Sequence, residues 1–211
     1  MPLICVSRTA TELASDAELE AARIELAERH HLHLRGFLSQ ELRDFIADGV
    51  ERATFTPFTH ATGALDYSMA EGPEMDALAF ALADPVLIRV VERLSGRRPL
   101  TSFHGRAYRM LEGPHFDEWH DDLDGNRQVA ITVNLGRAPY EGGHLLMRTH
   151  PEKEPVFDIH NKEPGDAILF MIGEHLEHTI TSVVGSVPKT AFAGWYCSQP
   201  DRLSKKIFRL G

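Results

Sequence analysis

Cysteine is scarce in this sequence: its 211 residues contain two, Cys5 and Cys197, far apart and without the spacing of a metal-binding motif. No apolar run approaches the roughly 20 residues that a membrane-spanning helix needs. The first residues also lack the basic stretch and small-residue cleavage site of a signal peptide. These absences exclude a disulfide scaffold and predict a cytoplasmic protein with reduced thiols and no membrane partner.

Positive charge is scarce as well. Lysine and arginine number 22 against 31 aspartates and glutamates, which gives a net charge of −9. A nucleic-acid-binding protein usually presents a basic face to the phosphates, so we expect no nucleic-acid partner. The 43% of hydrophobic residues and the length are typical of one globular domain, which we place at 1–211. The sequence leaves the oligomeric state open.

The first half of the chain, 1–98, has mainly helical patterning. Apolar residues recur at helical spacing in four segments, and two of these begin with a residue that caps helices, Ser39 and Asp84. The alternation of polar and apolar residues in His31–Leu34 predicts a short strand, and 54–72 is expected to be a loop that could contain another short strand. The predicted helices are 11–29, 40–53, 73–83 and 84–94.

Beyond Gly96, turn-forming residues recur at short intervals between apolar runs. Short strands separated by such turns predict an antiparallel sandwich or barrel over 99–211. We therefore predict an α+β fold with a mainly β core, in which the N-terminal helices cover one face of the sheets. The predicted strands are 129–135, 143–147, 167–172 and 191–196.

Candidate metal ligands occur in Trp119-His120-Asp121-Asp122 and, further on, at His178. On an extended segment the side chains of His120 and Asp122 would project to the same side, because they are two positions apart. Two histidines and one carboxylate on a β scaffold form the facial triad of non-haem Fe(II) oxygenases. Two alternatives compete with this set: the upstream pair His115-x-Asp117, and His175 in place of His178.

The pattern downstream favours His120, Asp122 and His178. In order, the chain carries His120-x-Asp122, Glu141-Gly142-Gly143, Pro164-Gly165-Asp166, His178, Lys189 and Trp195. With this ordered set, the region 101–198 resembles the 2-oxoglutarate/Fe(II)-dependent dioxygenase superfamily, in particular its prolyl-hydroxylase-like branch. The resemblance implies a double-stranded β-helix, also called a jelly roll, of the cupin-like kind. It also implies Fe(II) bound by the three ligands, with 2-oxoglutarate and O2 as cosubstrates.

The resemblance further implies a binding site for 2-oxoglutarate. Lys189 would pair with its distal carboxylate, with Arg127 or Arg148 as the next candidates, and Tyr108 matches a tyrosine that contacts the cosubstrate. Asn134 lies in a run of period two, on one face with Ala130 and Thr132. A buried asparagine needs hydrogen-bond partners, so we expect Asn134 to face the cosubstrate. Trp195 is expected to pack in the barrel.

The resemblance implies an enzyme that hydroxylates an unactivated C–H bond and releases succinate and CO2. We expect its substrate to be a small polar metabolite, an amino acid or a peptidyl residue, contacted by the loops 54–72, 112–126 and 148–162. Two other functions stay open on the same fold: a cupin-like metal-binding protein, and a metal enzyme that needs no cosubstrate.

Overall fold

The computed structural model describes residues 1–60, 63, 65–113, 117–123 and 126–198. Its four helices are α1 (Asp16–Arg29), α2 (Gln40–Arg52), α3 (Pro73–Leu82) and α4 (Pro85–Ser95). None of the helices in these ranges is long and apolar enough to cross a bilayer. The strands are β1 (Ile4–Val6), β2 (Thr11–Leu13), β3 (His31–Leu34), β4 (Phe55–Thr59), β5 (Leu65–Met69), β6 (Ser102–Met110), β7 (Arg127–Asn134), β8 (Glu141–Gly142), β9 (Leu145–Thr149), β10 (Pro155–Ile159), β11 (Ala167–Met171), β12 (Leu176–Ile180), β13 (Val183–Val184) and β14 (Lys189–Cys197).

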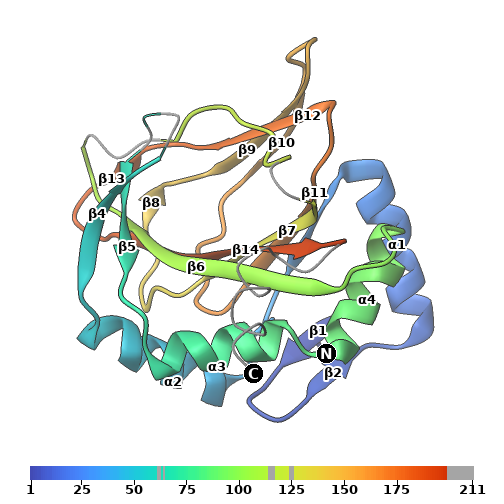
Figure 1. The fold of residues 1–211 in the computed structure, drawn as a ribbon, viewed down its shortest axis with the longest axis horizontal. Helices are drawn as coiled ribbons and strands as arrows, with labels where there is room; N and C mark the ends of the chain where they lie inside the picture. The colour runs from blue at the N-terminus through green and yellow to red at the C-terminus, as the bar shows by residue number, and fades with distance from the viewer. Residues whose placement is uncertain (61–62, 64, 114–116, 124–125, 199–211) are drawn as a thin grey trace, which may run out of the picture.

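Two sheets face each other across the barrel. The large sheet has the strand order β3-β11-β7-β14-β6-β5-β4, and the small sheet has the order β10-β9-β12, with β13 and β8 paired beside them. All strand pairs within these sheets are antiparallel. Figure 1 shows β9, β10 and β12 on one side of the large sheet and the helices α2 and α3 on the other. This is the mainly β core that the residue pattern predicts, in the jelly-roll arrangement that the family resemblance implies.

The central strands bury both faces, and their period-two alternation separates two apolar cores. In β7, Val129, Ile131 and Val133 belong to the core that the large sheet shares with the helices. Ala130 belongs instead to the core between the two sheets. The predicted division of this strand into two faces is therefore confirmed, and the inner face is the one that can line a site.

The helix starts follow from their capping residues. Ser15 caps α1 in a reciprocal capping box with Glu18, and the Ser39 hydroxyl accepts a hydrogen bond from the Leu42 amide at 3.3 Å. Asp84 accepts from the Val86 amide at 2.9 Å, and Pro85 follows it at the first helical position. The predicted helices 40–53, 73–83 and 84–94 are confirmed to within two residues.

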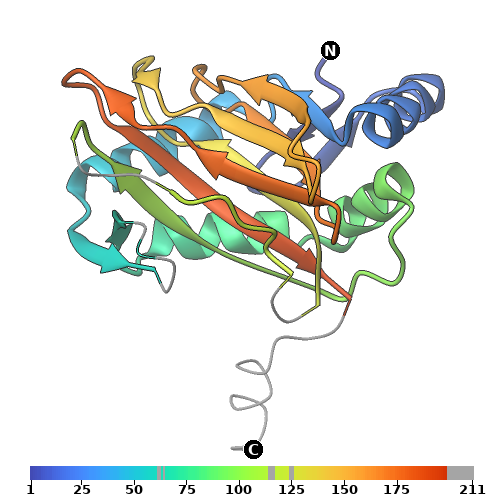
Figure 2. The same ribbon diagram turned by 90° about the horizontal axis from the view of Figure 1, so that it is seen from above.

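One prediction for the N-terminal half is wrong, and a second is only partly right. No helix starts at position 11, because Thr11–Leu13 pairs with β1 as a strand and the helix begins only after the Ser15 cap. The segment 54–72 holds a hairpin of two strands, β4 and β5, which extends the large sheet at its edge. Pro57 fits there because an edge strand has amide positions that need no partner. With β3, three strands of the large sheet thus come from the half that was expected to be mainly helical (Figure 2).

Candidate metal centre

The two histidines of the candidate site, His120 and His178, are held together by a pair of backbone hydrogen bonds. His120 lies in the loop after β6, and His178 lies in β12, where it is buried. The His120 amide donates to the His178 carbonyl at 3.0 Å, and the His178 amide donates to the His120 carbonyl at 2.8 Å. This two-bond bridge leaves the centroids of their rings 4.3 Å apart.

Asp122 completes the cluster through a turn. Its φ is +60°, so the segment after His120 is not extended, contrary to the reasoning from spacing. Aspartate is one of the residues that tolerate this left-handed conformation. The carboxylate lies with Oδ1 3.8 Å from Nε2 of His120 and Oδ2 3.3 Å from Nε2 of His178.

The donor atoms fit a divalent transition metal. One ligand atom from each of the three residues lies within 4.8 Å of the other two. The Nδ1 atom of His120 is 2.7 Å from the carbonyl oxygen of Glu118, which can only accept a hydrogen bond. Nδ1 therefore carries the proton, and Nε2 keeps its lone pair for a metal. Two imidazole nitrogens and one carboxylate oxygen are the donor set of a facial Fe(II) site.

The electrostatics favour an ionised Asp122. Burial alone would raise the pKa of this carboxyl, but its contacts with His178, His120 and Trp195 outweigh burial and lower the pKa below its ordinary value. Asp117 behaves differently, because burial dominates and raises its pKa although both histidines lie nearby.

Of the competing ligands, His115 lies outside the described residues, and Asp117 and His175 are not part of the cluster. Asp117 is 3.7 Å from Nδ1 of His120, the nitrogen already bound to Glu118, and is not part of the three-residue cluster. His175 is exposed in the turn before β12.

A cavity of about 730 Å³ lies over the cluster. All three candidate ligands line it, and its inner wall includes Tyr108 and Thr132. Burial raises the pKa of the Tyr108 hydroxyl, so it stays a neutral hydrogen-bonding group. A cavity of this volume is within the usual range for small-molecule sites.

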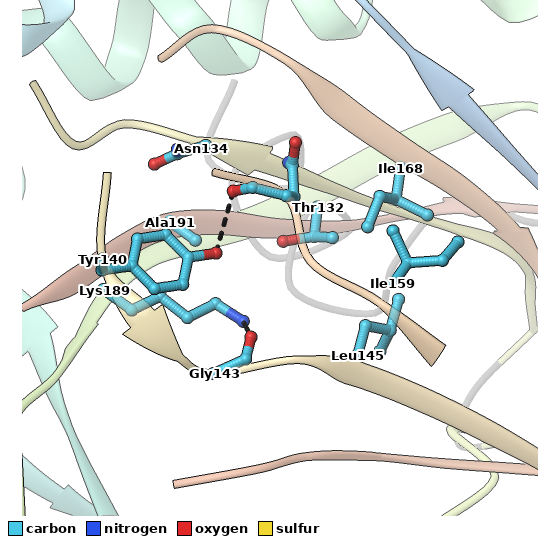
Figure 3. Close-up of a pocket in the computed structure, with 10 residues that line it drawn as sticks. Thr132, Asn134, Tyr140, Gly143, Leu145, Ile159, Ile168, Lys189 and Ala191 are labelled. Carbon is cyan, nitrogen blue, oxygen red and sulfur yellow. Dashed lines mark hydrogen bonds between the residues drawn. The ribbon is translucent and has the colours of Figure 1, made fainter. Parts of the chain in front are cut away.

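Lys189 lies in an adjoining small cavity of about 10 Å³, shown in Figure 3. Thr132 and Leu145 line both cavities, so the two are neighbours. The lysine is 4% exposed, and its Nζ donates to the Gly143 carbonyl at 2.7 Å. Burial lowers the pKa of Lys189 to about 7, although the Asp117 charge acts in the opposite direction. A buried ammonium without an anionic partner within bonding distance among the described residues suits an incoming carboxylate.

The other two residues predicted to contact the cosubstrate, Tyr108 and Asn134, line different cavities. Tyr108 faces the large cavity, as expected. Asn134 lines the small cavity, but its Nδ2 donates to the Lys162 carbonyl at 2.7 Å and its Oδ1 accepts from the Gly136 amide at 2.9 Å. Both ends of this side chain therefore already bind backbone.

The two arginines considered for the cosubstrate anion are engaged elsewhere. Arg148 pairs with Glu177 at 2.7 Å and stacks over the Trp119 ring, with its Cζ 4.0 Å from the ring centroid. Arg127 binds Asp122 Oδ1 at 3.0 Å. Lys189 is thus the better-placed cation for a ligand carboxylate.

Sequence reasoning missed one residue beside the site, Tyr140, and did not foresee the contacts that Arg127 and Trp195 make. The centroid of the Tyr140 ring lies 5.9 Å from Nζ of Lys189, and the Tyr140 hydroxyl donates to the Asn161 carbonyl (Figure 3). Its position just before Glu141-Gly142-Gly143 was the available signal. Arg127 was considered only as an anion binder, and Trp195 only as packing. The Trp195 Nε1 in fact donates to Asp122 Oδ2 at 2.7 Å.

One family model matches the β core of the chain. Residues 104–197 match the family model of the 2OG-Fe(II) oxygenase superfamily. No curated protein sequence matches the chain significantly.

Solved structures share the fold at low sequence identity. A 2OG-Fe(II) oxygenase family oxidoreductase from Burkholderia pseudomallei is 18% identical, with a TM-score of 0.66 over 89% of this chain and 95% of its own. A prolyl-4-hydroxylase from Pseudomonas putida is 20% identical, with a TM-score of 0.62 over 85% and 98%. The non-haem α-ketoglutarate-dependent epimerase SnoN from nogalamycin biosynthesis is 13% identical, with a TM-score of 0.62 over 87% and 84%.

Proposed function

We propose that this chain is an enzyme of the 2OG-Fe(II) oxygenase superfamily, whose family model matches residues 104–197, and that it hydroxylates an unactivated C–H bond and releases succinate and CO2. We propose Fe(II) as the metal and 2-oxoglutarate and O2 as the cosubstrates, the set that the name of this superfamily and the cluster of three ligand residues support. The observation that carries the proposal is the convergence of His120, Asp122 and His178 under one cavity, next to the pocket of Lys189.

In this proposal the three clustered side chains hold the metal. Iron bound there supplies the oxidation of the C–H bond, coupled to decarboxylation of 2-oxoglutarate. The Nδ1 hydrogen bond from His120 to Glu118 keeps its Nε2 directed at the metal. Asp122 is held ionised by its neighbours, so it supplies negative charge without first losing a proton.

Lys189 is the proposed partner of the distal carboxylate of 2-oxoglutarate. Its ammonium uses one donor on Gly143 and has two left in the described structure. An anion that is buried in this pocket needs such a counter-charge. The Tyr108 hydroxyl on the wall of the adjoining cavity is the proposed second contact, and Asn134, bound to backbone at both ends, shapes the pocket from β7.

For the substrate we propose a small polar metabolite, an amino acid or a peptidyl residue. The cavity wall mixes apolar side chains such as Phe58 with the ion pair of Arg106 and Asp66, whose closest atoms are 2.5 Å apart. The net charge of −9 opposes a polyanion such as nucleic acid.

The experiment is a screen of amino acids, short peptides and small metabolites for succinate release, followed by mass analysis of the product. We expect a substrate-dependent release and a product that has gained one oxygen atom. A product of unchanged mass would replace hydroxylation with an isomerisation like that named for SnoN. Turnover only with methylated oligonucleotides would contradict the substrate class.

We further propose that the protein works in the cytoplasm. The net charge of −9 and the presence of only two cysteines, Cys5 and Cys197, in 211 residues fit a protein that does not depend on a disulfide framework. Cell fractionation tests the location, and recovery in an oxidising compartment would contradict it.

A further inference from the structure

Both oxygens of the Asp122 carboxylate bind groups that are not candidate ligands. Oδ2 accepts from the Trp195 Nε1 at 2.7 Å, and Oδ1 accepts from an Arg127 guanidinium nitrogen at 3.0 Å. The Arg127 guanidinium also stacks on the Trp195 ring, with its Cζ 3.9 Å from the ring centroid. The side chains of Asp122, Arg127 and Trp195 therefore all contact one another, and each contact restricts the geometry of the other two.

We propose that Arg127 and Trp195 are positioning residues that fix the orientation of the Asp122 carboxylate for metal binding. This inference rests on the proposed function, because it assigns Asp122 as a ligand. Both residues act through Asp122, to which each donates a hydrogen bond.

The need for such support follows from the backbone. His178 lies in a strand, and His120 is tied to it by two backbone hydrogen bonds. Asp122 lies in a loop with left-handed φ and has no strand partner in the described structure. Its carboxylate can rotate about two side-chain bonds, so hydrogen bonds to both oxygens are what hold it in one orientation.

Arg127 would change metal affinity in opposite directions through its charge and through its effect on the orientation of the carboxylate. A guanidinium beside a ligand repels a divalent cation, so through its charge alone Arg127 would weaken metal binding. Through orientation of the carboxylate it would strengthen metal binding, as groups that hydrogen-bond to metal ligands do. The sign of the change on removing Arg127 therefore separates the two roles.

The test is calorimetric titration of metal-free protein with Mn²⁺. We expect Trp195→Phe, which keeps a ring for Arg127 to stack on but removes the N–H donor, to weaken Mn²⁺ binding by roughly 10–100-fold. Arg127→Met should weaken it in the same range, and Arg127→Lys should recover only part of the loss, because a lysine cannot both stack flat and bond Oδ1.

Arg109→Met is the matched control. The Arg109 guanidinium stacks on Phe55 with its Cζ at the same 3.9 Å, and it binds Thr190, so it resembles Arg127 without contacting Asp122. We expect its Mn²⁺ affinity to stay within about twofold of wild type, a change of less than about 0.5 kcal/mol. The visible spectrum of bound Co²⁺ gives a second readout, and it should change in the Trp195 and Arg127 variants only.

Two results would overturn the inference while the proposed function stands. One is unchanged Mn²⁺ affinity and an unchanged Co²⁺ spectrum in Trp195→Phe, whatever its melting temperature. The other is tighter Mn²⁺ binding by Arg127→Met, which would assign Arg127 a role through charge alone. A wild-type protein that binds no Mn²⁺ would contradict the proposed function, and this inference with it.

Discussion

The Nζ of Lys189 lies 2.7 Å from the carbonyl oxygen of Gly143. This contact joins the start of β14 to the turn before β9 and places a charged side chain among otherwise uncharged described residues around the small cavity. Gly143 has a φ of +61°, and a Cβ added there would lie 2.9 Å from Cδ of Lys189 and 3.0 Å from Cε2 of Tyr140. The glycine is thus required by its backbone conformation and by the lysine beside it.

Gly143→Ala should therefore disturb the cosubstrate pocket. We expect a higher KM for 2-oxoglutarate with Mn²⁺ affinity unchanged, since the added methyl group pushes on Lys189 and not on the metal cluster. Gly185→Ala is the matched control, because Gly185 also has a positive φ, +80°, but a Cβ there meets nothing within 4 Å. Both variants should lose about 1–2 kcal/mol of stability, so equal KM values in the two would contradict the prediction.

Lys189→Met should weaken cosubstrate binding directly. The lost charge-assisted contact is expected to cost about 1.5–3 kcal/mol, which corresponds to a KM for 2-oxoglutarate raised roughly 10–150-fold. Steady-state kinetics with varied 2-oxoglutarate measure this. Unchanged kinetics would move the anion-binding role to another cation.

The same substitution should change how stability depends on pH. Burial lowers the pKa of Lys189 to about 7, whereas an unfolded lysine titrates near 10.4. Between these values the unfolded chain holds a proton that the folded chain has released, so this group makes the free energy of unfolding rise with pH. Below pH 7 both states are protonated, and the full cost of burying the charge is present.

Metal-free Lys189→Met lacks this cost. At pH 6 it should be more stable than wild type by a few kcal/mol, with an upper limit of about 5 kcal/mol from the size of the pKa change. The difference should shrink steadily from pH 7 to pH 10. Urea unfolding of both proteins at several pH values measures it, and a difference independent of pH would show that Lys189 is not buried as a charge.

His178→Ala should abolish tight Mn²⁺ binding while the protein stays folded, because it removes one of the three clustered donors. His175→Ala is the control: this exposed histidine lies three residues earlier, in the turn before β12, and the variant should bind Mn²⁺ as wild type does. Equilibrium dialysis with metal analysis gives both results. Full metal binding by His178→Ala together with loss in His175→Ala would exchange their roles.

The sequence predicts the helices and central strands well because their signals are local. Ser39 and Asp84 cap helices through their own next turn, and the alternation in 129–135 needs only that the strand has two buried faces. The helix expected from position 11 fails because the pairing of Thr11–Leu13 with β1 is a contact between segments, which periodicity does not record.

The candidate site, too, is only partly predictable from local sequence signals. The types and order of His120, Asp122 and His178 are visible in the sequence, but their convergence depends on a left-handed turn and on a bridge between distant segments. The roles of Arg127 and Trp195 around Asp122 could not be read from spacing, since Trp195 comes from β14, which lies beside Arg127's strand only in the folded sheet.

The central claim is that the chain decarboxylates 2-oxoglutarate at a metal held by His120, Asp122 and His178. The most direct measurement is release of labelled CO2 from 2-oxoglutarate labelled at C1, with Fe(II) and a substrate found in the screen, in wild type and in Asp122→Ala. We predict release by wild type that stops on metal chelation, and none above background in Asp122→Ala. Equal release by the two proteins would contradict the account.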